Sequence, residues 1–147
     1  MRLKRIIISI LLAVCVCVGF CLPVYAETDA ANPSIAIVSP LYDIANHATS
    51  DLVIVGTKAE YRSYALGNNA VTITVEQTLQ KYSGWFWIWN NVDGASWSKT
   101  VNGSSVSLSN TKSGLTSGKY RLKSVFTLTD KNGKTETITV YSDEKNV

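Results

Sequence analysis

Few residues of this chain carry the functional groups that catalysis or metal binding needs. Asp43, His47 and Asp51 follow one another at intervals of four, which on a helix would align two carboxylates and the single histidine. Ligands of those types could bind a divalent transition metal. The polar residues between them are typical of a loop, however. We therefore expect a solvated connection at this position, with no metal and no cofactor.

Groups for nucleophilic catalysis are missing from the sequence after residue 26. All three cysteines precede that residue, and no serine occupies a Gly-x-Ser-x-Gly nucleophile elbow. Asp93 and Asp130 could form the carboxylate pair of a glycosidase, yet both lie in turn sequences, Asp-Gly and Asp-Lys-Asn-Gly. The sequence predicts a protein without enzymatic activity, and a glycan-active enzyme is the remote alternative.

The most distinctive stretch is 84–90, which reads Gly-Trp-Phe-Trp-Ile-Trp-Asn and holds three of the four tryptophans. We predict that it forms a strand. Because side chains alternate faces along a strand, the indoles of Trp85, Trp87 and Trp89 would share one face, and the two apolar residues between them would share the other. One of the two faces would then need either a core or a partner to cover it.

The loop before this strand decides which way the indoles point. A three-residue loop, Tyr82-Ser83-Gly84, would turn them into the core, whereas a two-residue loop, Ser83-Gly84, would turn them outward. Glycine in third place favours the first. Indoles in the core would make the chain a purely structural or accessory domain. Outward aromatic rings would bind a glycan or a protein, and the candidate binding face is Tyr82, Trp85, Phe86, Trp87, Trp89 and Ile88.

The rest of the chain alternates apolar and polar residues in short runs separated by turn sequences, and no run after residue 26 has a helical period. The predicted strands are 52–66 with a break near Gly56, 71–80, 96–101, 105–110, 119–129 and 135–141. With the tryptophan strand they number about seven. Short antiparallel strands at this spacing indicate an all-β fold, either a sandwich or a small barrel.

The N-terminus has the pattern of a secretory signal peptide. Three basic residues precede an apolar run from Ile6 to Leu22, and Val24 and Ala26 supply the small residues of a cleavage site. We expect cleavage after Ala26 and a secreted, extracellular product. Residues 1–26 would be the signal peptide, 27–38 a polar N-terminal lead and 39–147 the folded domain.

The expected mature chain is electrically neutral, since 11 basic residues balance 11 acidic ones once three basic residues leave with the signal. A neutral chain has no excess of basic residues that would attract nucleic acid or an anionic membrane. We expect no membrane insertion after cleavage. We also expect the basic residues Lys119, Arg121 and Lys123 to form a solvated face that pairs with Glu136 across the last hairpin.

The run Leu115-x-x-Gly118-x-Tyr120-x-Leu122 matches a tyrosine corner, in which a tyrosine hydroxyl returns to the backbone of the preceding connection. Immunoglobulin-like and fibronectin-like sandwiches carry this corner in their next-to-last strand. Leu122 stands where antibody domains have a cysteine, so we expect no disulfide between the sheets. The fold expected is therefore an immunoglobulin-like β-sandwich, with structural roles for Tyr120, Leu122 and Trp97.

Several of these residues together resemble a group of small secreted proteins of Gram-positive bacteria, a family of unknown function. The resemblance lies in Leu79-Gln80-Lys81-x-x-Gly84-Trp85-x-x-Ile88, Trp97, Gly118-x-Tyr120-Arg121-x-Lys123, Glu136 and Tyr141-Ser142. It extends over about 39–147 and implies a secreted β-sandwich. No catalytic motif comes with it, and Trp87 and Trp89 are additional to the shared pattern.

Overall fold

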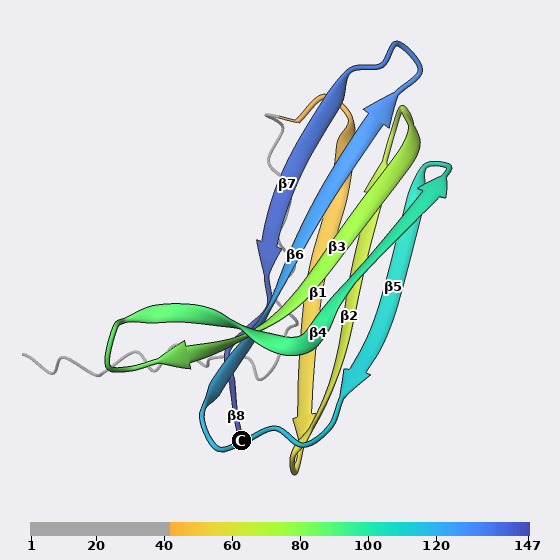
Figure 1. Cartoon of the computed structure of the whole chain (residues 1–147). Helices are drawn as coiled ribbons and strands as arrows, with labels where there is room; N and C mark the ends of the chain where they lie inside the picture. The colour runs from red at the N-terminus through yellow and green to blue at the C-terminus, as the bar shows by residue number, and fades with distance from the viewer. Residues whose placement is uncertain (1–41) are drawn as a thin grey trace, which may run out of the picture. The chain divides into compact units, whose positions relative to one another are not determined.

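A computed structural model describes residues 42–147, which fold into eight β-strands without a helix (Figure 1). The predicted signal peptide and most of the N-terminal lead lie outside these residues. Among the residues described, none belongs to a helix that could cross a membrane. The strands are β1 (Ala45–Val55), β2 (Lys58–Gly67), β3 (Ala70–Ser83), β4 (Ile88–Asn102), β5 (Ser105–Lys112), β6 (Lys119–Asp130), β7 (Thr135–Tyr141) and β8 (Lys145–Asn146).

The strands form two antiparallel sheets, which confirms the predicted all-β sandwich. One sheet has the order β1-β2-β5, and the other has the order β4-β3-β6-β7, with the short β8 paired to β6. In immunoglobulin constant domains the fourth strand joins the sheet of the first two. Here β4 instead pairs with β3, so the two form one long hairpin at the edge of the second sheet (Figure 1).

The core lies between the sheets because alternate residues of each long strand face inward. In β6 every second residue from Tyr120 to Leu128 faces inward and is buried. Phe126 and Leu128 belong to one apolar cluster, and Tyr120 and Leu122 belong to a second one. Ser124, between these two pairs in β6, belongs to neither cluster and is fully buried.

Around Ser124, between the two apolar clusters, buried polar side chains connect the two sheets. The Ser124 hydroxyl lies 2.8 Å from that of Ser50 in β1 and 2.6 Å from that of Ser63 in β2. Gln77 of β3 donates its amide N–H to Ser63 Oγ at 2.7 Å. Buried polar groups that are fully hydrogen-bonded are tolerated in a core and favour one register. Hydroxyl groups therefore link β1, β2 and β6 across the core.

Tyr120 has the geometry that the tyrosine-corner pattern predicts. Its hydroxyl donates a 2.6 Å hydrogen bond to the carbonyl oxygen of Thr116, four residues upstream in the β5–β6 connection. Leu122 is fully buried. Trp97 is partly buried, and its ring centroid lies 5.3 Å from that of Tyr61. These contacts close one end of the sandwich.

The predicted turn at Asp93-Gly94 does not form, because β4 runs through it from Ile88 to Asn102. Thr78 pairs with Ser96 and Gln80 with Asn91, so a single β3 residue faces four residues of β4. Gly94, at φ 62°, lies within this bulge, and its missing side chain allows the left-handed backbone that absorbs the extra residues.

Glu136 does not pair with the basic residues of β6. Its carboxylate accepts the backbone N–H groups of Asp43, Ile44 and Ala45 at 2.7, 3.0 and 3.1 Å. A carboxylate that accepts several consecutive backbone donors forms strong, charge-assisted hydrogen bonds. Glu136 of β7 thus fixes the start of β1, which belongs to the other sheet.

Candidate functional site

The β3–β4 hairpin extends beyond the sandwich, because β6 stops pairing with β3 before the hairpin ends. The β3–β6 ladder finishes at Lys81 and Tyr120, whereas β3 continues to pair with β4 through Tyr82–Trp89 and Ser83–Ile88. Figure 1 shows the hairpin projecting from the edge of its sheet. Its last residues therefore have a partner strand on one side only.

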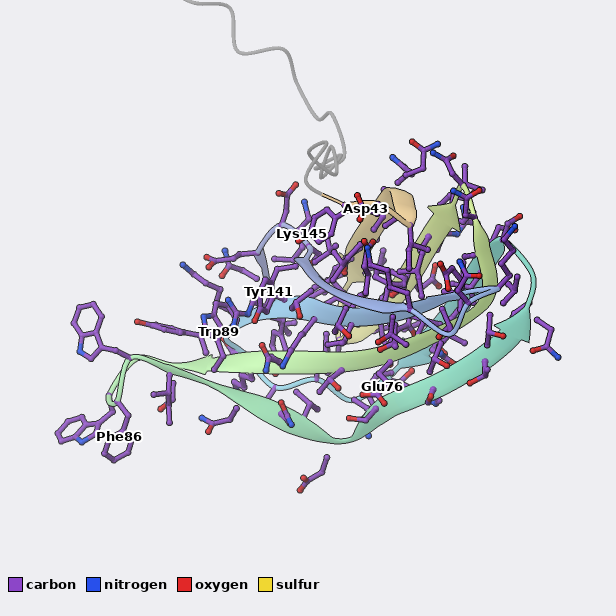
Figure 2. All side chains as sticks on the ribbon, turned by 90° about the horizontal axis from the view of Figure 1, so that it is seen from above. Asp43, Glu76, Phe86, Trp89, Tyr141 and Lys145 are labelled. Atoms are coloured by element: carbon purple, nitrogen blue, oxygen red, sulfur yellow. The ribbon has the colours of Figure 1, made fainter. Side chains whose placement is uncertain are left out.

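The hairpin closes through the four-residue turn Gly84–Trp87, which we call the tip together with Ile88. The exposed fractions are 86% for Trp85, 67% for Phe86, 82% for Trp87 and 48% for Ile88. Figure 2 shows Phe86 at the far end of the hairpin, away from both sheets. These four large apolar side chains, consecutive in the sequence, are thus presented to solvent together.

This turn corrects the predicted tryptophan strand. Neither the three-residue nor the two-residue loop forms, and Trp85 and Trp87 lie in the turn itself instead of alternating along a strand. The register is set by Tyr82, which pairs with Trp89 and places its ring centroid 5.2 Å from that indole. Aromatic cross-strand pairs stabilise a register. The three indoles consequently do not share one face.

Trp87 has a left-handed backbone conformation, with φ 58°. Among the residues described, it is the one non-glycine residue with positive φ. For an L-residue this conformation costs roughly 1–2 kcal/mol, because Cβ crowds the following carbonyl oxygen. Strain of this kind is concentrated at binding and switch regions of proteins, so a bulky aromatic residue here is a pointer to function.

Behind the tip, aromatic and basic side chains stack on the outer face of the hairpin; we call this group the neck. The Arg121 guanidinium lies 4.2 Å from the Trp89 ring centroid and 4.1 Å from that of Tyr141. Its Nε donates to Gln80 Oε1 at 3.0 Å. Cation–π stacking from both sides fixes the guanidinium and holds Trp89 against the sheet. Trp89 is accordingly half-buried.

Lys119 completes the neck. Its ammonium lies 5.9 Å from the Tyr82 ring centroid and forms a 2.9 Å ion pair with Glu144. The hydrogen bond and the charge of Glu144 raise the pKa of Lys119 above its ordinary value, so the ammonium is charged at any physiological pH. The sequence-predicted residues Tyr82 and Trp89 therefore belong to this neck, and the other four belong to the tip.

The opposite side of the hairpin base borders a cleft of about 480 Å³. Lys81 reaches across it, donating to Thr116 Oγ1 at 2.6 Å with its ammonium 5.5 Å from the Tyr120 ring centroid. Lys112 and Asp93 also line the cleft. Basic side chains thus lie on both sides of the hairpin immediately behind the tip.

The residues considered for metal binding do not gather. His47 and Asp51 lie in β1, where the sequence predicted a loop, and they pair with Leu66 and Arg62. Asp43 precedes the strand and forms an ion pair with Lys134, whose charge and hydrogen bond lower the pKa of Asp43. Within residues 42–147 no three histidine, cysteine or acidic side chains come together as a metal site would require.

The two aspartates considered as a glycosidase pair are also separated. Asp130 pairs with Ala70 at the start of β3, and its carboxylate accepts the N–H groups of Asn132 and Lys134 in the β6–β7 turn, as its sequence predicted. Asp93 lies in the bulge opposite Leu79. Nine residues along a strand span about 30 Å, whereas a glycosidase needs its carboxyl groups within about 10 Å.

Sequence reasoning identified the aromatic residues as a candidate site but gave no site role to Gln80, Arg121 and Tyr141, although all three belong to the family pattern that the chain resembles. Gln80, Arg121 and Tyr141 come from three different strands, and only the pairing of β3, β6 and β7 brings them together. No protein-family model matches the chain, and no curated protein matches it either. Inference about function therefore depends on the geometry of the hairpin.

Proposed function

We propose that the chain is a secreted, non-catalytic β-sandwich that binds an extracellular partner through the tip of the β3–β4 hairpin. The observation that carries the proposal is the exposure of Trp85, Phe86 and Trp87 on a turn that extends beyond the sheets. Contiguous exposed apolar side chains usually mark an interaction site, because their hydration costs free energy that a partner recovers.

A second observation supports the same function. The tip keeps a bulky aromatic residue at a position where its backbone is strained, although asparagine or glycine would fit there without that cost. The structural alternative places the tryptophans in the core, but Trp85 and Trp87 are more than four-fifths exposed. Of the four, only Trp89 and Trp97 are partly buried, so a structural role accounts for those two alone.

Export belongs to the proposal, since it depends on the signal sequence in residues 1–26. Membership of the Gram-positive secreted family that the sequence resembles is likewise proposed, and it agrees with a small exported binding domain. The neck supplies the rigidity that a binding tip needs, because Arg121 and Gln80 tie the hairpin to β6. A preorganised tip loses less conformational entropy on binding.

The test is retention of the protein by the envelope of the cells that produce it. The purified secreted chain is mixed with washed envelope, and the bound fraction is compared with that of the double variant Trp85→Ser with Trp87→Asn. We expect the variant to lose most of the binding without a fall in its melting temperature, because neither exposed indole packs in the core. Val55→Ser, which removes another exposed apolar side chain from the end of β1, should bind normally. Equal retention of all three proteins would refute the proposed function.

A further inference from the structure

We propose that the tip binds a phospholipid bilayer and inserts into its headgroup region, with the neck at the level of anionic phosphates. The inference rests on the proposed function, since it names the partner of the same tip. It follows from three features of the hairpin: the lack of polar side chains at the tip, the type of its apolar residues, and the position of the basic residues behind it.

Apart from the two indole N–H groups, the tip has no side-chain hydrogen-bonding group that could recognise a polar partner. From Gly84 to Ile88 the sequence contains glycine, tryptophan, phenylalanine and isoleucine only. A sugar site combines aromatic stacking with polar groups that fix orientation, and a protein hot spot is centred on anchors that fill a matching pocket. A bilayer requires neither polar groups nor a matching pocket. Transfer of apolar side chains from water to its acyl region lowers the free energy without directional bonds.

The residue types match the interface of a bilayer better than its interior. Tryptophan is enriched at the membrane–water boundary, where its ring is apolar and its N–H remains hydrated. A turn leaves backbone polar groups that need water, so irregular backbone exposed to lipid does not occur in the hydrocarbon core. The Gly84–Trp87 turn with its two indoles therefore fits shallow insertion, at the boundary between headgroups and acyl chains.

The geometry of the hairpin sets which residues meet the phosphates. Interfacial segments bury their apolar groups by roughly 5–10 Å, a depth that two or three residue pairs of a hairpin span at about 3.3 Å per residue. Counting back from the turn, these pairs are Ser83–Ile88, Tyr82–Trp89 and Lys81–Asn90. Lys119 stacks on Tyr82 and Arg121 on Trp89. The basic side chains therefore lie at headgroup level when the tip is inserted.

Charge at this level is positive although the expected mature chain is neutral. Within the three residue pairs behind the turn, the neck and the cleft contribute three basic side chains and one acidic side chain, which gives a net charge of +2: Lys81, Lys119, Arg121 and Glu144. Basic residues near the surface are attracted to anionic lipids over about a Debye length. The neutral net charge predicted no affinity for an anionic membrane, and the proposal departs from that expectation. Strand pairing gathers basic side chains behind the tip, and the net charge of the whole chain does not reveal this local excess.

The experiment measures binding of the purified secreted chain to vesicles of phosphatidylcholine, with and without phosphatidylglycerol. We expect cosedimentation with both and tighter binding when phosphatidylglycerol is present, a difference that added salt removes. Trp85→Ser with Trp87→Asn should lower the partition coefficient by roughly tenfold or more, and Val55→Ser should leave it unchanged. Lipids brominated near the carbonyl should quench tryptophan fluorescence more than lipids brominated near the chain end.

Each outcome separates this inference from the proposed function. Tip-dependent retention by the cell envelope without tip-dependent vesicle binding would overturn the bilayer proposal and indicate an envelope glycan or protein as the partner. Vesicle binding that the double variant retains in full would overturn it as well. Loss of tip dependence in both assays would refute the proposed function together with the inference.

Discussion

Trp87 combines a strained backbone conformation with an exposed aromatic side chain. The left-handed φ of 58° disfavours any residue with a bulky Cβ substituent, and the indole is almost fully exposed, so it returns little packing energy. The proposed binding role would account for an aromatic residue at this position. Strain retained at an exposed aromatic residue is the single-residue signature of the proposed site.

Trp87→Asn should stabilise the domain while weakening binding. Asparagine tolerates the left-handed conformation, so we expect the free energy of unfolding to rise by about 0.5–1 kcal/mol. Trp87→Ala is the matched control, because alanine keeps the strain and should change stability by less than about 0.5 kcal/mol. Urea denaturation measures both. A loss of several kcal/mol in the alanine variant would mean that the indole packs against the core.

Tyr120→Phe removes one hydroxyl and leaves the carbonyl oxygen of Thr116 without its 2.6 Å donor. We expect the free energy of unfolding to fall by about 1–3 kcal/mol, since the buried tyrosine loses its hydroxyl bond and the carbonyl oxygen of this part-buried contact loses its donor. Tyr141→Phe is the control, because that side chain is 42% exposed and its hydroxyl can bond to water. Equal denaturant midpoints for the wild type and the Tyr120 variant would contradict the corner.

At the scale of elements, the β3–β4 hairpin is the unit that carries the candidate site. Its inner part pairs with β6 and belongs to the sheet, whereas its last pairs lie beyond the end of β6. The neck compensates for the missing neighbour, because the stack of Trp89, Arg121 and Tyr141 ties the hairpin to β6 and β7. The tip can thus be exposed without leaving the hairpin unsupported.

The junction between β1 and β7 gives a test of how the two sheets are joined. Glu136 accepts three consecutive backbone N–H groups at the start of β1, so Glu136→Ala should cost about 1–3 kcal/mol of unfolding free energy. Glu144→Ala, which breaks only an exposed ion pair with Lys119, should cost less than about 0.5 kcal/mol. Indistinguishable thermal unfolding of the two variants would argue against the junction.

At the scale of the whole molecule, the expected export determines where the tip meets its partner. We expect secretion to remove residues 1–26, so that the released protein begins at Glu27. Intact-mass spectrometry of the culture medium checks the cleavage site directly. Full-length chain recovered from the membrane fraction would show that the N-terminal segment is retained as an anchor.

The sequence alone determined the features that depend on local pattern. Period-two alternation located β2, β3, β6 and β7, and the turn residues between the strands indicated an all-β fold, although not the order of the strands in the sheets. The spacing around Tyr120 anticipated the hydroxyl contact with the β5–β6 connection. Each of these signals lies within about a dozen neighbouring residues, so short-range sequence could carry it.

Tertiary structure decided the features that depend on partners from distant strands. The run of aromatic residues is compatible with a strand or a turn, and the choice between them follows from the Tyr82–Trp89 pair and from the position at which β6 begins, Lys119. The bulge at Gly94 and the three bonds to Glu136 likewise need partners far away in the chain. The indoles are exposed because the β3–β4 register places Trp85 and Trp87 in the turn. That register is set by strand pairing and packing across the sheet, and the local periodicity of the sequence does not encode it.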